Sequence, residues 1–518
     1  MKLTWTTTIL TCVLLADVFK PMVVTSMVTS YEKLRQFMRT GDTPLIQAIQ
    51  DAVNEKLAQI DKLTTSIKTL TTLLTKQSMT LSKDNQLTTD HPNSFYLLIR
   101  NYVRTWHSSN TTLTKELQNH NISLPTLDDF ADARRALIRL QNVYKLRAGD
   151  MFEGDYLGYK GPTLTTEDAI LLGSSAFADG YAAESRDWLQ LCASLLEKAM
   201  WARQKQTQSS AEGGEGTPIE GLLRDYSLVL PQLARAHLYL NDTDRAWSLY
   251  HRCKKSKWVD HETLTELRHH LDSKEFQKGL GPFTLQLHRN ISVLCSRQKR
   301  QRITELRPYH VCRYKSNPFI PYQRFEEEIL STSPYVSLFY DVIYDAEIEK
   351  LKELTRDGLK RARVLGKSEK GEISTTRTGE VSWVADSQDP LVAHVSLRLR
   401  ALTRLDVTIR PVKKTSGELL QVVNYGLAGH YDVHLDTKLK NVQNDRDIQT
   451  RLATVLFYLS DVEKGGATIF PAVGISVAPV KGMALFWYNL QPVMAGPDLA
   501  TFHSGCPVLI GNKWIANK

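Results

Sequence analysis

The sequence lacks several features that would assign it to common protein classes. It has no Cys-x-x-Cys pair, which argues against a structural zinc site. Beyond the N-terminal segment it has no run of about 18 apolar residues, so we expect no membrane span in the mature chain. Its formal net charge is only +9 over 518 residues, and no long basic stripe is interleaved with aromatic residues. We therefore expect no nucleic-acid partner, and interpret the basic run 297–302 as a solvated linker in preference to a nucleic-acid patch.

The N-terminus has the pattern of a secretory signal. Lys2 is followed by the mostly apolar segment 9–18, and the small residues Thr25 and Ser26 come next. This pattern predicts a signal peptide over residues 1–26, with an amphipathic helix start as the alternative. Four Asn-x-Ser/Thr tripeptides agree with exposure to a lumenal compartment: Asn110, Asn121, Asn241 and Asn290. The C-terminal residues Ala-Asn-Lys contain no KDEL-type retention signal.

The cysteine count is odd once the signal peptide is removed. Cys12 lies in the predicted signal, which leaves five cysteines in the mature chain. At least one thiol should therefore be free or paired between chains. Cys295 and Cys312 are separated by a polar stretch and are the predicted disulfide pair. Closing that loop would stabilise the fold by roughly 3 kcal/mol on the chain-entropy model.

Residues 27–145 have a helical pattern. Their apolar positions alternate in steps of three and four, which predicts a coiled-coil seam. The seam consists of Ile46, Ile49, Val53, Ile60, Leu63, Ile67, Leu70 and Leu74, with Lys56 in its gap. Such a stripe must be buried against another helix. We predict a dimerisation region, and a helix pair within one chain is the alternative.

Residues 146–260 are predicted to be helical hairpins of the tetratricopeptide type. Thr165 followed by Asp168 resembles a capping box, with Asp in place of Glu. Small and large residues then alternate at helical spacing from Leu172 to Trp188, and again from Leu233 to Tyr250. A generic helical spacer is the alternative interpretation. Residues 261–330 are charged and contain proline, so we expect a connector there.

From residue 331 to residue 518 the pattern becomes rich in short strands. A helix is predicted over Asp345 to Arg363, before most of them. The strand candidates are Val336–Tyr340, Leu419–Tyr425, His430–Asp436, Ala453–Leu459, Ala467–Phe470, Met483–Trp487 and Val508–Ile510. Many short strands after a helix indicate a sandwich or jelly-roll barrel. The chain as a whole is predicted to be a multidomain α+β protein.

The predicted strand His430–Asp436 contains two His-x-Asp pairs. Residues two apart in a strand face the same way, so His434 and Asp436 could grip one metal, and so could His430 and Asp432. A third ligand from another strand would complete the two-His, one-carboxylate face used by non-heme Fe(II) oxygenases. His503 is a candidate for it. Lys513 follows a Gly-Asn turn and could pair with a carboxylate of 2-oxoglutarate, although a solvated turn lysine is the alternative.

The C-terminal motifs together resemble the catalytic domain of the collagen prolyl 4-hydroxylase α-subunit family. The helical half is similar to that family's dimerisation region and tetratricopeptide-like peptide-substrate domain. The motifs are Leu420-Gln-Val-Val-Asn-Tyr-Gly426, His434-Leu-Asp436, Leu456-Phe-Tyr-Leu-Ser-Asp461, Gly465-Gly-Ala-Thr-Ile-Phe-Pro471, Phe486-Trp-Tyr-Asn-Leu490 and His503-Ser-Gly-Cys-Pro-Val-Leu-Ile-Gly-Asn-Lys-Trp514. The fold that this resemblance implies for residues 331–518 is a double-stranded β-helix (jelly-roll) domain.

The resemblance implies a place in the site for eight residues and a lesser role for two more. Iron would be bound by His434, Asp436 and His503, with His430 and Asp432 in supporting or strand-surface roles. Lys513 would bind 2-oxoglutarate, and Tyr425 and Tyr431 would line its pocket. Arg377 and Trp383 match an Arg-x-x-x-x-x-Trp pattern near the substrate groove.

The implied reaction is 4-hydroxylation of proline in X-Pro-Gly collagen-like peptides, with decarboxylation of 2-oxoglutarate to succinate and CO2. It would require Fe(II), O2 and ascorbate. The implied partners are protein disulfide isomerase as the β subunit, a second α subunit and a proline-rich peptide. The implied location is the endoplasmic reticulum lumen.

The sequence departs from the family in two places. In the family a Trp and a helical tail with a further Cys follow the position of Lys518, so we expect Cys506 to be the odd thiol. Gln232, Arg235 and Leu238 occupy a region where the family has tyrosines. These departures favour an alternative, namely a catalytically weak paralogue that serves as a peptide-binding or assembly subunit.

Overall fold

The structure is a computed structural model. It describes residues 47, 49–61, 64, 91–107, 125–209, 219–273, 282–297, 311–317, 320–364, 372–373, 376–407, 409, 416–437, 451–492 and 496–518. The chain divides into two compact units, Met1–Lys83 and Asp84–Lys518. The predicted signal peptide, Asn110 and Asn121 lie outside the described residues. Among the described helices, none combines the length and apolarity that crossing a bilayer requires.

The first unit contributes one described helical stretch. Residues 49–61 are helical, as the seam pattern predicts. Ile49, Val53 and Ile60 are 45%, 47% and 39% exposed, so this part of the apolar stripe is not buried within the chain. The other seam positions, including Leu63 and Ile67, lie outside the described residues.

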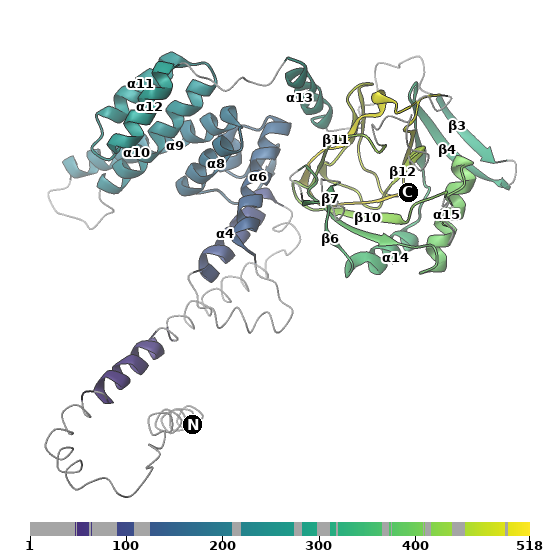
Figure 1. The fold of residues 1–518 in the computed structure, drawn as a ribbon, viewed down its shortest axis with the longest axis horizontal. Coiled ribbons are helices and arrows are strands. Elements are labelled where there is room, and N and C mark those ends of the chain that lie inside the picture. Colours follow the sequence, from purple (N-terminus) through teal and green to yellow (C-terminus); the bar gives the residue numbers. More distant parts are fainter. Residues whose placement is uncertain are drawn as a thin grey trace, which may run out of the picture. The chain divides into compact units, whose positions relative to one another are not determined.

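The second unit begins with a set of helices, shown in blue and teal in Figure 1. They are α4 (Pro92–His107), α6 (Leu127–Tyr144), α7 (Ala148–Phe152), α8 (Thr166–Ala178), α9 (Ala182–Ser209), α10 (Ile219–Tyr239), α11 (Thr243–Lys254), α12 (His261–Ser273) and α13 (Pro282–Cys295). A short ladder of β1 (Asp155–Tyr156) and β2 (Tyr159–Lys160) follows α7. The predicted capping box of α8 is confirmed, because Thr165 and Asp168 satisfy each other's backbone N–H groups.

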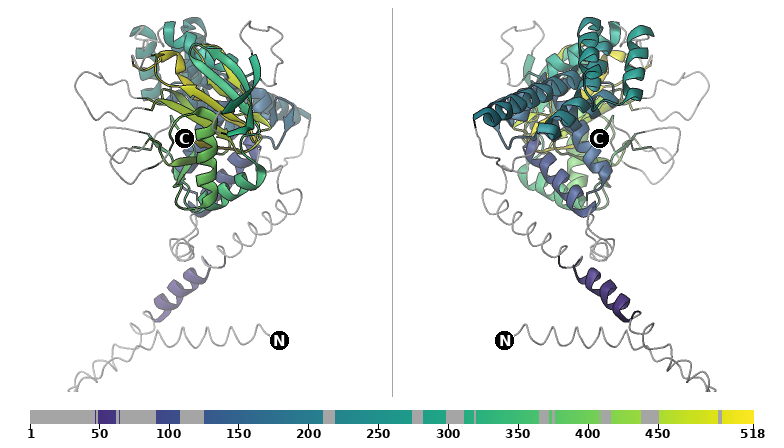
Figure 2. Two further views of the ribbon diagram at one scale, coloured as in Figure 1. Left: turned by 90° about the vertical axis from the view of Figure 1, so that its right-hand side faces the viewer. Right: turned by 90° about the vertical axis from the view of Figure 1, so that its left-hand side faces the viewer.

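Helices α8 to α12 pack consecutively against one another, side by side in Figures 1 and 2. Small residues make the close contacts possible. A Cβ at Gly173 of α8 would come within 2.7 Å of Leu189 Cγ on α9. The fully buried Trp188 donates its indole N–H to Gln141 of α6, which ties the hairpins to the preceding helix. The predicted small–large alternation is therefore explained by helix–helix packing in this region.

The range 261–330, expected to be a connector, contains regular structure. It holds α12 and α13, and then β3 (Val311–Asn317) and β4 (Ile320–Thr332). The charged residues that suggested a linker belong to these elements; for example, the half-exposed Arg313 of β3 pairs its guanidinium with the buried Glu327 of β4. Of the basic run 297–302, only Arg297 is described.

The C-terminal part is built on two antiparallel sheets. The first has nine strands in the order β3-β4-β5-β16-β12-β19-β10-β9-β6, and the second has four in the order β11-β17-β14-β15. The further strands are β5 (Tyr335–Tyr340), β6 (Lys360–Arg361), β7 (Arg363–Val364), β8 (Glu372–Ile373), β9 (Glu380–Val384), β10 (Leu420–Tyr425), β11 (Tyr431–His434), β12 (Ala453–Tyr458), β13 (Lys464–Gly465), β14 (Thr468–Phe470), β15 (Ile475–Val477), β16 (Ala484–Tyr488), β17 (His503–Gly505), β18 (Val508–Ile510) and β19 (Lys513–Asn517).

The nine-stranded sheet buries apolar residues on both faces. One face packs under α14 (Asp345–Arg356) and α15 (Pro390–Thr403), with Val422, Phe457 and Ala516 in that core. The other face meets the four-stranded sheet, and Phe470 packs there among residues of both sheets. Helix α14 is shorter than predicted, because it ends at Arg356, just before Gly358, and the chain then enters β6. The predicted core strands are confirmed to within a residue or two.

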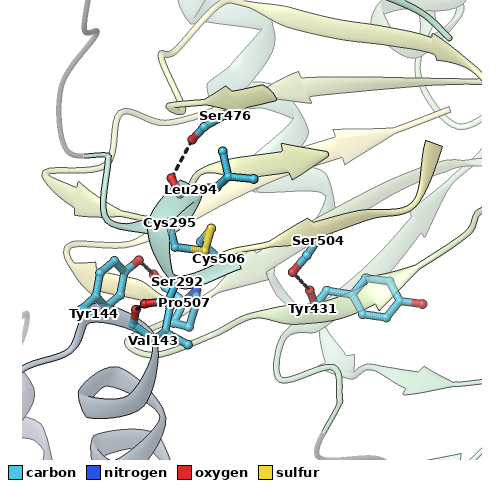
Figure 3. The surroundings of a disulfide bond; sticks show 10 residues. All are labelled: Val143, Tyr144, Ser292, Leu294, Cys295, Tyr431, Ser476, Ser504, Cys506 and Pro507. Carbon is cyan, nitrogen blue, oxygen red and sulfur yellow. Dashed lines mark hydrogen bonds between the residues drawn. A yellow bond between two sulfur atoms is a disulfide. The ribbon is translucent and has the colours of Figure 1, made fainter. Parts of the chain in front are cut away.

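The predicted disulfide is wrong. Cys295 is bonded to Cys506, across 211 positions, and not to Cys312 (Figure 3). Helix α13 packs on β14 and β15, which brings its last residue beside the chain segment that follows β17. Cys312 instead lies exposed on β3, at an edge of the nine-stranded sheet. Cys506 is therefore not the odd thiol; Cys192, Cys253 and Cys312 are free.

Candidate metal centre and its cleft

His434 and His503 face each other across two neighbouring strands. They are direct register partners in the pairing of β11 with β17, and their ring centroids are 4.2 Å apart. Asp436 follows β11, and its Oδ1 lies 3.6 Å from His434 Nε2 and 3.8 Å from His503 Nε2. One ligand atom from each residue lies within 4.8 Å of the others, and no second cluster of this kind occurs in the described part of the chain. These three residues can coordinate one cation from one side and leave the coordination positions on its opposite side open for other ligands.

Backbone carbonyls orient both imidazole rings. His434 Nδ1 is 2.7 Å from the carbonyl oxygen of Asp432, and His503 Nδ1 is 3.1 Å from that of Thr501. A carbonyl only accepts, so each Nδ1 must carry a proton, and Nε2 is the ring nitrogen that faces Asp436. Burial and the neighbouring His434 lower the pKa of His503 to about 4, which keeps this ring neutral.

The Asp436 carboxylate is held by a chain of hydrogen bonds from the nine-stranded sheet. Thr454 of β12 donates to Asp436 Oδ2 at 2.7 Å, and Asn489 donates to the Thr454 hydroxyl at 3.0 Å. Trp487 in turn donates to Asn489 Oδ1 at 2.8 Å. Burial alone would raise the pKa of Asp436, but the two histidines and the Thr454 hydroxyl outweigh it and lower the pKa well below its usual range. Asp436 is therefore ionised, as a metal ligand must be.

The competing His-x-Asp pair does not join this cluster. Strand β11 is shorter than predicted, and its pairing with β17 shifts register between Tyr431 and His434. His430 is buried, with Nδ1 2.7 Å from the Thr378 hydroxyl and Nε2 3.2 Å from Asp432. Both members of that pair are thus engaged away from His503.

Lys513 is the first residue of β19 and follows the turn Gly511-Asn512, in which the Gly511 φ of +97° lies in the region that favours glycine. The lysine is only 2% exposed, and burial lowers its pKa to about 7. Its Nζ lies 5.8 Å from the ring centroids of both Tyr425 and Tyr458. Among the described residues it has no hydrogen-bond or ion-pair partner. An ammonium buried without an anion is costly, so this position fits a carboxylate supplied by a bound molecule.

The remaining predicted residues line the same cleft. Tyr425, Tyr431, Arg377 and Trp383 border it together with the His434 cluster and Lys513. Tyr431 stacks on the His434 ring with a centroid distance of 3.5 Å, and the Arg377 guanidinium lies 4.7 Å from the Tyr431 centroid. Trp383 is 42% exposed and lies at the rim. All eight residues predicted from the sequence therefore meet at one cleft.

Four further residues of this cleft region were not predicted from the sequence. Thr454 and Arg451 contact Asp436, with Arg451 Nη1 at 3.9 Å from Asp436 Oδ1, and Asn489 donates to the Thr454 hydroxyl. Gln421 accepts a hydrogen bond from Arg377 at 2.9 Å. No local sequence spacing identifies these four residues, because each lies on a different strand or loop from the residue that it contacts. The only local signal is that Thr454 and Gln421 are polar residues inside otherwise apolar strands.

Comparisons with known proteins match both halves of the chain. A family described as prolyl 4-hydroxylase alpha-subunit, N-terminal region, matches residues 30–158. The 2OG-Fe(II) oxygenase superfamily matches residues 420–518. Prolyl 4-hydroxylase subunit alpha-1 of Rattus norvegicus is 31% identical over 507 residues, covering 92% of this chain and 90% of its own.

Two further relatives give the same result. Subunit alpha-2 of Gallus gallus is 32% identical over 507 residues, covering 92% of this chain and 91% of its own. Subunit alpha-3 of Homo sapiens is 31% identical over 413 residues, covering 76% of this chain and 73% of its own. Among solved structures, a viral collagen prolyl hydroxylase from Paramecium Bursaria Chlorella virus-1 in complex with 2OG is 25% identical, with a TM-score of 0.29. It covers 36% of this chain and 96% of its own.

Proposed function

The chain belongs to the prolyl 4-hydroxylase alpha-subunit family, and from this premise we propose that its cleft hydroxylates the 4-position of proline in X-Pro-Gly collagen-like peptides. It is an enzyme, a 2-oxoglutarate-dependent procollagen-proline 4-dioxygenase. Its family implies Fe(II), 2-oxoglutarate and O2 as reactants, with succinate and CO2 as products of the co-substrate. The observation that carries the proposal is the convergence of His434, Asp436 and His503 with a partnerless buried Lys513 in one cleft.

His434, Asp436 and His503 would bind Fe(II), and the bound metal would supply the activation of dioxygen. The two neutral imidazoles and one carboxylate suit Fe(II), and their arrangement leaves open positions for a bidentate ligand and O2. The carbonyls of Asp432 and Thr501 fix the ring orientations before any metal arrives. Thr454 holds the carboxylate so that Oδ1 faces the two Nε2 atoms. The protein's part in metal binding is this preorganisation.

Lys513 would bind the distal carboxylate of 2-oxoglutarate. Its ammonium is buried near Tyr425 and has no internal anion, so a carboxylate entering the cleft would restore its charge. Binding above pH 7 would therefore take up a proton at Nζ. Tyr425 and Tyr431 would form the walls of this pocket and limit the access of water to it.

Arg377 and Trp383 would form the peptide side of the cleft. Arg377 is only 9% exposed and reaches over Tyr431, which stacks on the metal ligand His434. The exposed Trp383 offers an apolar surface suited to a proline ring. These residues bind and orient substrate, and we assign neither of them a proton-transfer step.

The finer architecture is proposed on the following grounds. Two antiparallel sheets enclosing one apolar core support a double-stranded β-helix (jelly-roll). The consecutive packing of α8 to α12 supports a tetratricopeptide-like peptide-substrate domain over residues 146–260. The exposed apolar stripe through Ile49, Val53 and Ile60 supports a coiled coil with a second α subunit.

The cellular setting is likewise proposed. The signal-like N-terminus and a disulfide support residence in the endoplasmic reticulum lumen. Asn241 and Asn290 are exposed, as glycosylation would require. Protein disulfide isomerase as the β subunit and ascorbate as a reductant are proposed from the family resemblance. The catalytically weak paralogue is not favoured, because the candidate metal ligands are complete.

The proposed function is tested by peptide turnover. The full chain, produced with and without protein disulfide isomerase, would be loaded with Fe(II) and given 2-oxoglutarate and a Pro-Pro-Gly repeat peptide. We expect one 4-hydroxyproline per succinate formed, with greater yield when the isomerase is present. A folded, iron-loaded complex that forms succinate but no hydroxyproline, or neither product, would overturn the proposal.

A further inference from the structure

A row of side chains crosses the cleft wall at right angles to the strands. Trp383, Gln421, Asn517 and Leu456 are successive register partners on β9, β10, β19 and β12, and all four line the cleft. Adjacent strands in this row are about 5 Å apart, so it presents a continuous edge. Its two central members are the polar residues Gln421 and Asn517.

This row lies at the end of the cleft opposite Lys513. Asn517 and Lys513 are on the same strand and the same face, four residues and therefore about 13 Å apart. The apolar residues Val423 and Ile515 separate the two polar ends, again as register partners. Thr454 lies two residues before Leu456, on the same face of β12, and its hydroxyl donates to the Asp436 carboxylate. The row is thus beside the candidate metal ligands and away from the proposed 2-oxoglutarate lysine.

The row has unused hydrogen-bonding capacity. The Asn517 side-chain oxygen is buried and has no partner among the described residues, and the same is true of the Arg377 Nε–H. Gln421 accepts from Arg377 through Oε1, and its amide N–H groups have no partner within the described chain. A buried acceptor without a partner costs free energy, which a bound ligand recovers when it supplies the missing donor.

We infer that this row is a main-chain subsite for the peptide substrate, in which Asn517 accepts the N–H of the glycine that follows the target proline and Gln421 holds Arg377 in place. The inference rests on the proposed function and identifies two specificity-determining positions for it. Proline has no N–H, so in a Pro-Pro-Gly repeat the glycine N–H is the only main-chain donor. A single acceptor placed beside the metal ligands therefore selects one register of the repeat.

The chemistry of the row agrees with an extended, proline-rich ligand. Such a chain makes no internal hydrogen bonds, so its carbonyls are free to accept from Gln421 or Arg377. Trp383, at the end of the row, offers its exposed ring to a neighbouring proline. At the row, the donors of Arg377 and Gln421 lie next to the acceptor of Asn517. Along a peptide, carbonyl acceptors likewise alternate with N–H donors, so each group of the row can bind a complementary group of the peptide.

A double-mutant cycle tests the Asn517 contact, with the full chain in the same complex that is used to test the proposed function. The change in the protein is Asn517→Ala, and the change in the peptide is glycine to N-methylglycine in Pro-Pro-Gly repeats. We expect either change alone to lower kcat/KM for the peptide about fivefold to tenfold, the size of one lost hydrogen bond. Because both remove the same contact, the N-methyl peptide should lose little more with the Asn517→Ala enzyme.

Asn424→Ala is the matched control. Asn424 is one strand away on β10, its side-chain oxygen is also buried without a partner, and it does not line the cleft. We expect it to leave the peptide KM unchanged. The KM for 2-oxoglutarate should stay unchanged in Asn517→Ala, which shows that β19 and Lys513 are intact. Fully additive losses, or an Asn517→Ala enzyme with wild-type kcat/KM, would overturn the inference while leaving the proposed function standing.

Gln421 is tested as a positioning residue. Gln421→Leu removes the acceptor for Arg377, and we expect the peptide KM to rise several-fold with no change in the KM for 2-oxoglutarate. Gln421→Glu retains an acceptor oxygen and should restore most of the peptide affinity. Equal behaviour of the two variants would overturn the positioning role. Failure of the wild-type enzyme to hydroxylate the parent peptide is a different result, and it would overturn the proposed function itself.

Discussion

Cys295 and Cys506 join the last turn of α13 to the segment that follows the strand carrying His503. Neighbouring contacts reinforce this junction, since Tyr144 of α6 donates to the Pro507 carbonyl and Ser476 of β15 donates to the Leu294 carbonyl (Figure 3). The bond therefore connects the helical part of the second unit to the strand region that holds the candidate metal ligand.

The disulfide connectivity can be measured directly. We expect peptide mapping under non-reducing conditions to recover a Cys295–Cys506 peptide. In the native protein Cys312 should alkylate first because it is exposed, whereas Cys192 and Cys253 are buried and burial raises their thiol pKa to about 12 and about 11. A recovered Cys295–Cys312 peptide would contradict the structure.

Removing this bond should destabilise the protein. Closing so long a loop is worth roughly 5 kcal/mol on the chain-entropy model, so Cys506→Ser should lower the free energy of unfolding by up to about that amount. Urea unfolding in the absence of reductant measures it. Cys312→Ser is the control and should unfold like the wild type. If reductant lowers the stability of Cys506→Ser as much as that of the wild type, the bond is not the source of the effect.

The candidate third ligand, His503, and the histidine of the competing pair, His430, should behave oppositely when each is replaced. We expect His503→Ala to lose Fe(II) binding and activity with little loss of fold, because two remaining ligands bind Fe(II) weakly. His430→Ala should lose some stability, since His430 is buried against Thr378, but should still bind one equivalent of metal. Anaerobic metal titration with thermal unfolding distinguishes them. Full activity in His503→Ala would show that the third ligand is elsewhere.

Thr454 should tune metal affinity without touching the metal. Thr454→Val removes the hydrogen bond to Asp436 and is expected to weaken Fe(II) binding about 10- to 100-fold. Ser337→Ala is the control, because Ser337 is a buried hydroxyl without a partner in the same sheet. Competition with a metal indicator measures both affinities. Unchanged affinity in Thr454→Val would mean that Asp436 is oriented by other groups.

Lys513 should make the stability of the ligand-free protein depend on pH. Burial lowers its pKa in the folded protein to about 7 from the usual 10.5, so the unfolded chain binds more protons between those pH values. The free energy of unfolding due to this group should therefore rise with pH from about 7 to about 10, by up to about 1.4 kcal/mol per pH unit. Lys513→Met lacks the titrating ammonium, so its free energy of unfolding should exceed that of the wild type at pH 7. This difference in free energy should shrink toward pH 10. Denaturant unfolding of both proteins across this range checks it, and a pH-independent difference would contradict the buried ammonium.

Much of the candidate site was predictable because its chemistry is carried by local patterns. His434 is the last residue of β11 and Asp436 lies two residues further on, a spacing that already suggests that both can bind one metal. The capping box at Thr165 and Asp168 is also local, and it begins α8 as predicted. The disulfide was not predictable, because the choice between Cys312 and Cys506 depends on where α13 packs.

The amino-acid sequence by itself determined the ligand types, the strand and helix periodicities and the family motifs, since these depend on residues close together in the chain. The residues alone left both His-x-Asp pairs open, and the family resemblance favoured His434 and Asp436. The tertiary structure brings this pair to His503, because His434 is the register partner of His503, whereas His430 precedes β11 and contacts Thr378. It alone also placed Gln421 and Asn517 in one row. Gln421 and Asn517 are 96 positions apart, and their pairing depends on the register of β10 and β19 within one sheet, which no local pattern encodes.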